Sequence, residues 1–353
     1  MQKSQLMSVM PLILSGLLAT QANAQEMDHS DHSDHSDHAK HDTSSGLHTH
    51  HAHQAGSWML EYKFMRMEMD GMLDGKDEVS SAEITAMPGM GGYGYMMTPE
   101  SMTMDMHMFM LMYGITNRLS LMGMFNYLDN EMDMITRGGL KSTMSTSGVS
   151  DTVLGAMYQV NPALTLSLGL SIPTGSIEET GDMVMDPGTM RDVTLPYAMQ
   201  LGSGTYDFVP SATYNGQYED WTFGGQASYT FRTAENERDY TLGNRAEGSI
   251  WLKRSLSPSL VVSSRLAYAR WGNIDGMDKN ILIANPMGMK TSPTSNPNLQ
   301  GGSRVDLLLG VSAMFGHGSM LGLEFGVPIM QDLDGPQMQT DQIIAISYQY
   351  TVQ

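Results

Sequence analysis

Residues 163–172 read ALTLSLGLSI, and this stretch decides the fold. Large aliphatic side chains alternate there with small or polar ones; the aliphatic set is Leu164, Leu166, Leu168, Leu170 and Ile172. A period of two is the pattern of a β-strand with one apolar face. A tilted strand needs about nine to eleven residues to cross a bilayer, and this stretch has that length. It therefore predicts one strand of a membrane barrel.

The same alternation recurs along the rest of the chain. It predicts about twelve strands, near 57–69, 101–113, 118–128, 150–159, 163–172, 206–215, 219–232, 243–254, 258–270, 302–315, 319–328 and 341–352. Short turns alternate with longer loops, which lie at about 70–100, 129–149, 173–205, 233–242, 271–301 and 329–340. An even number of strands with short turns at one end is typical of outer-membrane proteins. The expected fold of 57–353 is therefore all-β, a transmembrane antiparallel up-and-down β-barrel. A soluble β-sandwich is the alternative.

Composition and missing motifs narrow the function. The chain has 353 residues, a formal net charge of −19, 36 Met and no Cys. Such an acidic chain is not expected to bind nucleic acid, because it cannot neutralise phosphates. The absence of Cys excludes disulfides and thiolate metal sites. The catalytic motifs G-x-S-x-G and H-E-x-x-H do not occur, so we expect neither an enzyme nor a required cofactor.

The first residues predict a signal peptide, over 1–24. Lys3 precedes an apolar stretch at 6–19, LMSVMPLILSGLLA, and Ala22 and Ala24 supply the small residues that signal peptidase requires. The apolar stretch is too short to span a bilayer. Together with the barrel pattern, the signal predicts a bacterial outer-membrane protein whose partner is lipid. The sequence leaves the oligomeric state open.

A histidine-rich tail follows, over 25–56, in which the triplet Asp-His-Ser repeats three times. Its nine histidines are His29, His32, His35, His38, His41, His48, His50, His51 and His53. With few apolar residues, the tail is expected to be disordered. Imidazoles interleaved with carboxylates suit transition-metal ions. Both ends of the predicted barrel fall on the short-turn side, so we expect the tail to lie in the periplasm. We expect it to bind metal ions there, and the alternative is a solvated linker whose histidines have no role.

Methionine occupies every second residue from Met102 to Met112. The other face of this strand carries Asp105 and His107, and charged groups avoid lipid. We therefore expect Asp105 and His107 to face the lumen and the six methionines to face lipid, as flexible apolar side chains. The alternative is a thioether ladder for Cu(I) or Ag(I), which are soft ions.

Neighbouring strands add methionines to the expected lumen. The predicted path for soft-metal ions consists of Met65, Met67, Asp105, His107, Met122 and Met124. Several weak ligands suit conduction, because an ion must leave as readily as it enters. Copper or silver ions are thus the expected cargo.

Four further stretches carry a family resemblance: PTGS at 173–176, LPYAMQLGSGTYD at 195–207, WGNIDG at 271–276 and QDLDGPQ at 331–337. They resemble the MetA-pathway of phenol degradation family of outer-membrane transporters. The tail, rich in His, Asp and Ser, resembles the leading segment of outer-membrane copper resistance proteins. These resemblances imply a barrel and two classes of cargo. The leading hypothesis is a transporter or channel for transition-metal ions in metal resistance, and the alternative is a channel for small aromatic or other hydrophobic compounds.

Overall fold

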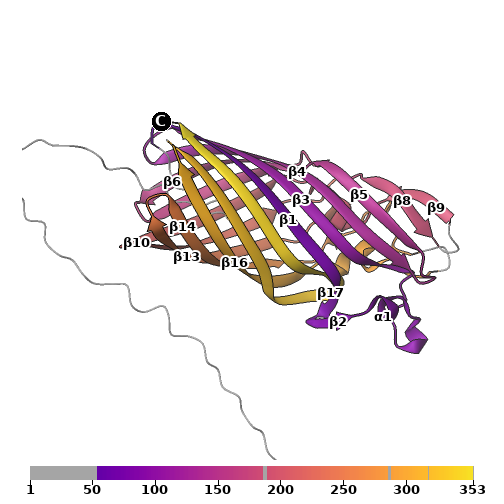
Figure 1. The fold of residues 1–353 in the computed structure, drawn as a ribbon. Coiled ribbons are helices and arrows are strands. Elements are labelled where there is room, and N and C mark those ends of the chain that lie inside the picture. The colour runs from indigo at the N-terminus through magenta and orange to yellow at the C-terminus, as the bar shows by residue number, and fades with distance from the viewer. Residues whose placement is uncertain (1–53, 186–188, 285–287, 317, 353) are drawn as a thin grey trace, which may run out of the picture. The chain divides into compact units, whose positions relative to one another are not determined.

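The structure is a computed structural model that describes residues 54–185, 189–284, 288–316 and 318–352. The predicted signal peptide and the nine histidines of the tail lie outside these residues, so their roles stay predictions. The described residues form an antiparallel barrel whose strands are steeply tilted (Figure 1).

Within the described residues the barrel wall has eleven labelled strands. They are β1 (Trp58–Gly75), β3 (Met97–Gly114), β4 (Leu119–Thr136), β6 (Thr152–Asn161), β7 (Leu164–Ile172), β10 (Asp207–Tyr218), β11 (Trp221–Arg232), β13 (Arg245–Ser257), β14 (Leu260–Trp271), β16 (Gly302–Phe315) and β17 (Ser319–Val352). Each pairs antiparallel with the next, and β17 also pairs with β1, which closes the barrel.

The last strand, β17, crosses the wall twice. Its part from Ser319 to Leu333 pairs with β16, whereas most of the remainder, up to Val352, pairs with β1. Gly335 has a φ of 104°, and the Gln331 side chain exchanges two 3.0 Å hydrogen bonds with the Thr340 backbone across the turn. In a closed barrel where each strand is antiparallel to both of its neighbours, the chain must cross the wall an even number of times. The double pass of β17 supplies that number, and the predicted barrel of about twelve strands is confirmed.

The outer face of the barrel is apolar, as the sequence predicts. On β7, Leu166 and Leu168 are 46% and 53% exposed, whereas the intervening Ser167 is half-buried and Thr165 is only 4% exposed. A continuous exposed apolar surface of this kind is stable only against lipid. A soluble sandwich would instead bury this face, so the sandwich alternative is excluded.

The wall extends farther on the loop side than the sequence predicts. β1 runs to Gly75, and β4 runs to Thr136 and pairs with β5 (Lys141–Val149), where loops at 70–100 and 129–149 are expected. A strand of 18 residues is roughly 60 Å long, about twice the hydrocarbon thickness, even before its tilt is considered. Beyond the bilayer the outward face of a strand carries charged residues, such as Glu131 and Asp133, although inward residues such as Met132 stay buried. The apolar outward face that marks a membrane strand is therefore lost. That is why these extensions resemble loops in the sequence.

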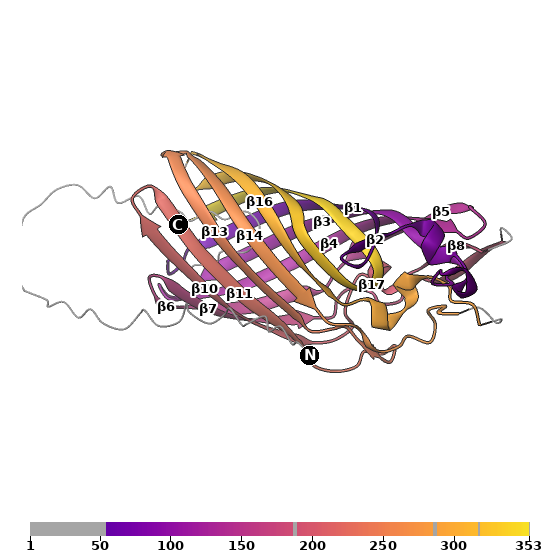
Figure 2. The ribbon, with the colours of Figure 1, turned by 90° about the horizontal axis from the view of Figure 1, so that it is seen from below.

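Shorter elements gather at the loop end. They are β2 (Asp77–Val79), α1 (Ser81–Thr85), η1 (Pro88–Met90), β8 (Thr180–Met185), β9 (Thr189–Thr194), η2 (Tyr197–Met199), β12 (Tyr240–Thr241), β15 (Asp275–Gly276), η3 (Pro293–Ser295) and η4 (Pro297–Leu299). β8 pairs with β9 in a hairpin, and Figure 2 shows β5 and β8 at this end, away from the C-terminus. In the part of the chain that the structure describes, no helix is long and apolar enough to cross a membrane.

Candidate functional site: the barrel lumen

The methionines of β3 face the lumen, which corrects the orientation predicted for this strand. In the β1–β3 register Met106 lies opposite Met65, and directly opposed residues point to the same face. Met110 and Met112 are 3% and 1% exposed, whereas Leu111 between them is 42% exposed. The six methionines from Met102 to Met112 therefore line the interior and do not face lipid.

Asp105 and His107 consequently lie on the outer face, and their predicted lumenal position is wrong. The His107 Nδ1 lies 2.8 Å from the Tyr62 hydroxyl, and its ring lies near that of Tyr127. Asp105 accepts two hydrogen bonds from Arg66, at 2.7 and 2.6 Å. These polar groups lie where the apolar band ends and the strand leaves the bilayer. Asp105 and His107 therefore avoid lipid by lying beyond the apolar band and not by facing the lumen.

The inward methionines of five strands form a continuous surface, the methionine wall. Its members are Met59, Met65, Met67, Met69, Met102, Met104, Met106, Met108, Met110, Met112, Met122, Met124, Met132, Met134, Met144 and Met157. Met122 lies opposite Met112 and Met124 opposite Met110, so both predicted methionines of β4 belong to it. The wall runs from the short-turn end of the barrel to the loop end.

The remaining strands bring buried ion pairs into the lumen, beside inward apolar side chains such as Trp251 and Leu308. Arg265 donates two hydrogen bonds to Glu324, at 3.0 and 2.6 Å, and the two side chains are only 8% and 2% exposed. Lys63 interacts electrostatically with both groups. Arg304 and Asp306 form a second pair at 2.9 Å. The lumen thus combines thioether and charged groups. The two meet on β1, where Lys63 lies opposite Met108 and Glu61 opposite Met110.

One predicted metal ligand already has partners. The sulfur of Met67 accepts hydrogen bonds from Arg304 Nη1 at 3.7 Å and from Thr340 Oγ1 at 3.8 Å. A guanidinium beside the sulfur repels any metal cation. Met67 is therefore a poor ligand, although it faces the lumen as predicted.

At the loop end, the methionine wall continues into a buried cluster, the mouth cluster. Its members are Met97, Met102, Met132, Met134, Met144, Met183, Leu195 and Met199, with Met69, Met104, Val193, Leu282 and Met338 packed against them. Met183 belongs to β8, so the β8–β9 hairpin covers the inner side of β4 and β5. The sequence analysis did not predict this cluster.

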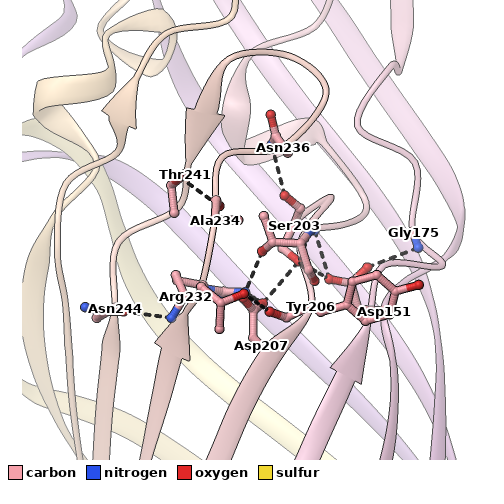
Figure 3. A network of polar contacts seen from close by, with 12 residues as sticks. Asp151, Gly175, Ser203, Tyr206, Asp207, Arg232, Ala234, Asn236, Thr241 and Asn244 are labelled. Atoms are coloured by element: carbon pink, nitrogen blue, oxygen red, sulfur yellow. Dashed lines mark hydrogen bonds and ion pairs between the residues drawn. The ribbon is translucent and has the colours of Figure 1, made fainter.

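The loop 173–205 is fastened to the barrel rim by a polar latch, whose residues are Asp151, Ser203, Asp207 and Arg232. The Asp151 carboxylate accepts hydrogen bonds from the Gly175 backbone at 3.1 Å and from Ser203 N and Oγ at 2.9 and 2.6 Å (Figure 3). A Cβ on Gly175 would lie 2.6 Å from the Leu201 carbonyl oxygen, so only glycine fits this crossing.

The other half of the latch centres on Asp207, which is fully buried. It accepts a hydrogen bond from Thr205 Oγ1 at 2.8 Å and forms an ion pair with Arg232. The Asn236 side chain donates to the Ser203 carbonyl at 3.0 Å (Figure 3). The stretches 173–176 and 195–207 resemble family motifs in the sequence, and here they supply Ser203 and Asp207 of the latch and Gly175, which donates to it. The partner Arg232 carried no sequence signal.

Two tyrosines join neighbouring loops beside the latch. Tyr197 and Tyr240 are buried, with ring centroids 5.1 Å apart in an edge-on arrangement. Burial raises the pKa of Tyr240 to about 12, and burial also raises the pKa of Tyr197. No group of three or more His, Asp or Glu side chains within the described ranges could hold a metal ion.

Comparison with known proteins supports the expected family. Residues 107–268, somewhat less than half of the chain, match the family model for the MetA-pathway of phenol degradation. The family motif at 195–207 and the latch lie within this match. No curated protein matches the chain in sequence.

Solved structures show the same fold. An outer membrane channel from Pseudomonas putida F1 has a TM-score of 0.59 and 14% identity, over 88% of this chain and 100% of that one. The beta domain of the Bordetella autotransporter BrkA has a TM-score of 0.47 and 11% identity, over 84% and 100%. The monoaromatic hydrocarbon channel CymD has a TM-score of 0.44 and 10% identity, over 85% and 89%. At such low identity, the first of these establishes the barrel fold alone.

Proposed function

We propose that the protein is an outer-membrane channel for small aromatic or similarly hydrophobic compounds. The continuous methionine wall, with charged groups beside it in the lumen, is the observation that carries this proposal. Thioethers are flexible and polarizable, and each contact of a methionine sulfur with an aromatic ring is worth about 0.3–1.5 kcal/mol. An aromatic ring would lie against the methionine wall, and a polar substituent would face the charged groups beside it.

The comparisons support this class of cargo over the metal ions that the sequence favoured. The matching family model concerns phenol degradation, and the Pseudomonas putida structure is that of a channel, which favours transport over catalysis. Transport of metal ions has no such support, and the predicted path loses Asp105 and His107 to the outer face. The metal-binding role of the histidine-rich tail remains a prediction.

The test is uptake of an aromatic solute by cells that depend on this channel. A porin-deficient Gram-negative host would express the full chain, and the initial rate of uptake of radiolabelled toluene would be compared with that of glucose. The variant M65K/M124K places two charges on half-buried positions of the methionine wall. It should lower toluene uptake about tenfold, because a desolvated charge replaces an apolar contact.

The matched control is M65L/M124L, which keeps both positions apolar and similar in volume. Its toluene uptake should stay close to that of the natural chain. Equal amounts of folded barrel are verified by the mobility of unheated samples in gel electrophoresis. Toluene uptake no faster than in cells without the protein, or unchanged by the two lysines, would refute the proposal.

A further inference from the structure

We infer that the mouth cluster is a binding site for a monovalent soft cation, Cu(I) or Ag(I). This site is additional to the proposed passage of hydrophobic solutes and does not depend on it. Of the thirteen residues in the cluster, ten are methionine, and only Leu195, Val193 and Leu282 are aliphatic. An ordinary apolar core favours Leu, Ile and Val, because methionine loses more side-chain entropy on burial and specifies packing poorly. The property that methionine adds is a soft sulfur ligand.

The register places four of these methionines in one row across the wall. Met102 lies directly opposite Met69 on one side and Met132 on the other, and Met132 lies opposite Met144. Directly opposed residues have Cβ atoms about 4.5–5.5 Å apart. Met102, Met132 and Met144 are 4%, 0% and 2% exposed. The three rotatable bonds of each side chain allow adjacent sulfurs to turn toward one ion.

A buried oxygen without a partner lies beside this row. Asn130 is 1% exposed and is the next inward residue before Met132 on β4, opposite Met104. Its Nδ2 donates to Thr146 Oγ1 at 3.4 Å, but its Oδ1 has no hydrogen-bond partner among the described residues. An unpaired buried carbonyl destabilises the folded state. A cation, or a water molecule that accompanies it, would satisfy this oxygen.

The charges around the mouth favour entry of a cation at this point. Exposed carboxylates lie on the outer face of the same strands: Asp70, Asp129, Glu131 and Asp133. Their field raises the local concentration of cations. Arg304 repels cations at Met67, which lies opposite Met104 at the inner edge of the cluster. The proposed site is therefore the row of Met102, Met132 and Met144, nearer the loop end. Neutral thioethers leave the charge of the ion uncompensated, which keeps binding weak enough for release.

The experiment measures silver bound by the full chain purified in detergent. After loading with Ag(I) and gel filtration, bound silver is counted, and X-ray absorption at the silver edge distinguishes sulfur from nitrogen neighbours. This distinction matters because tail histidines would bind silver through nitrogen. The variant M102L/M132L/M144L conserves side-chain volume, so its barrel is expected to fold. It should lose about one sulfur-coordinated silver per chain.

The control is M87L/M90L/M277L, which changes three exposed methionines outside the cluster. It should retain the sulfur-coordinated silver of the natural chain. The inference is overturned if the first variant retains that silver, or if silver in the natural chain has nitrogen neighbours alone. Should the triple variant fail to fold, Met132→Leu, which removes the central member of the row, must weaken sulfur-coordinated binding about tenfold. Failure here would leave toluene uptake unaffected, so the two proposals are tested separately.

Discussion

Arg265 and Glu324 show how much one buried contact contributes inside the barrel. Arg265→Met leaves the Glu324 carboxylate, 2% exposed, without two hydrogen bonds. A fully uncompensated buried charge destabilises a protein by roughly 3–5 kcal/mol, and here Lys63 still interacts with Glu324, so the loss should be smaller. The variant should nevertheless unfold at a lower urea concentration, measured by tryptophan fluorescence in detergent. R265M/E324L removes both charges of the pair and should recover part of the loss, because Lys63 keeps its interaction with Glu61. If the double variant is as unstable as the single one, the ion pair is not the cause.

Tyr240 makes the loop end sensitive to high pH. Its pKa is about 12 in the folded protein and about 10 when unfolded. The folded state therefore favours the neutral phenol, and the stability it contributes is complete below pH 10 and is lost as the pH rises toward 12. Cleavage of the loop 233–242 by an alkaline-stable protease should accelerate across that range. Tyr240→Phe should lose much of this pH dependence; an unchanged profile would assign it to another group, such as Tyr197.

Among the elements, the loop 173–205 depends most directly on the polar latch. Asp151→Ala removes the acceptor of three hydrogen bonds, and each bond to a charged group contributes about 1.5–3 kcal/mol. Limited proteolysis should cut this loop faster than in the natural chain while the barrel still migrates as a folded band. Asp182→Ala, on the exposed face of β8 in the same loop, is the control. Equal cleavage of the two variants would contradict the role of the latch.

The elements also show what a sequence can reveal. Membrane strands such as β7 and β11 were predicted to within about two residues, because lipid demands strict alternation. The orientation of β3 was missed because Asp105 and His107 were assumed to lie within the bilayer, where charged groups would have to face the lumen. Strand extensions such as the end of β4 carry charged residues on the outward face, so they lack the apolar alternation of a membrane strand. The latch and the mouth cluster join residues far apart in sequence, so only the register of the barrel brings them together.

For the whole molecule, the apolar band should define how deep each residue lies in the bilayer. Leu168 lies near the middle of β7 and is 53% exposed to lipid. Leu168→Arg should destabilise the barrel by roughly 2–4 kcal/mol, whereas Tyr127→Arg, at the edge of the band, should do so by roughly 0–1 kcal/mol. Reversible unfolding of the protein in phospholipid vesicles measures both. If the two variants lost equal free energy of unfolding, the apolar band would not mark the position of the bilayer.

The pairing of β1 with β17 also governs the order of events during biogenesis. Trp58 lies opposite Val352, so the ring cannot close until the final residues have been synthesised and delivered to the membrane. Contacts between such distant residues form slowly. Until the second pass of β17 has paired, β1 and the first pass of β17 each present an unpaired edge that can recruit strands of other chains. We therefore expect a chain interrupted within this second pass to aggregate.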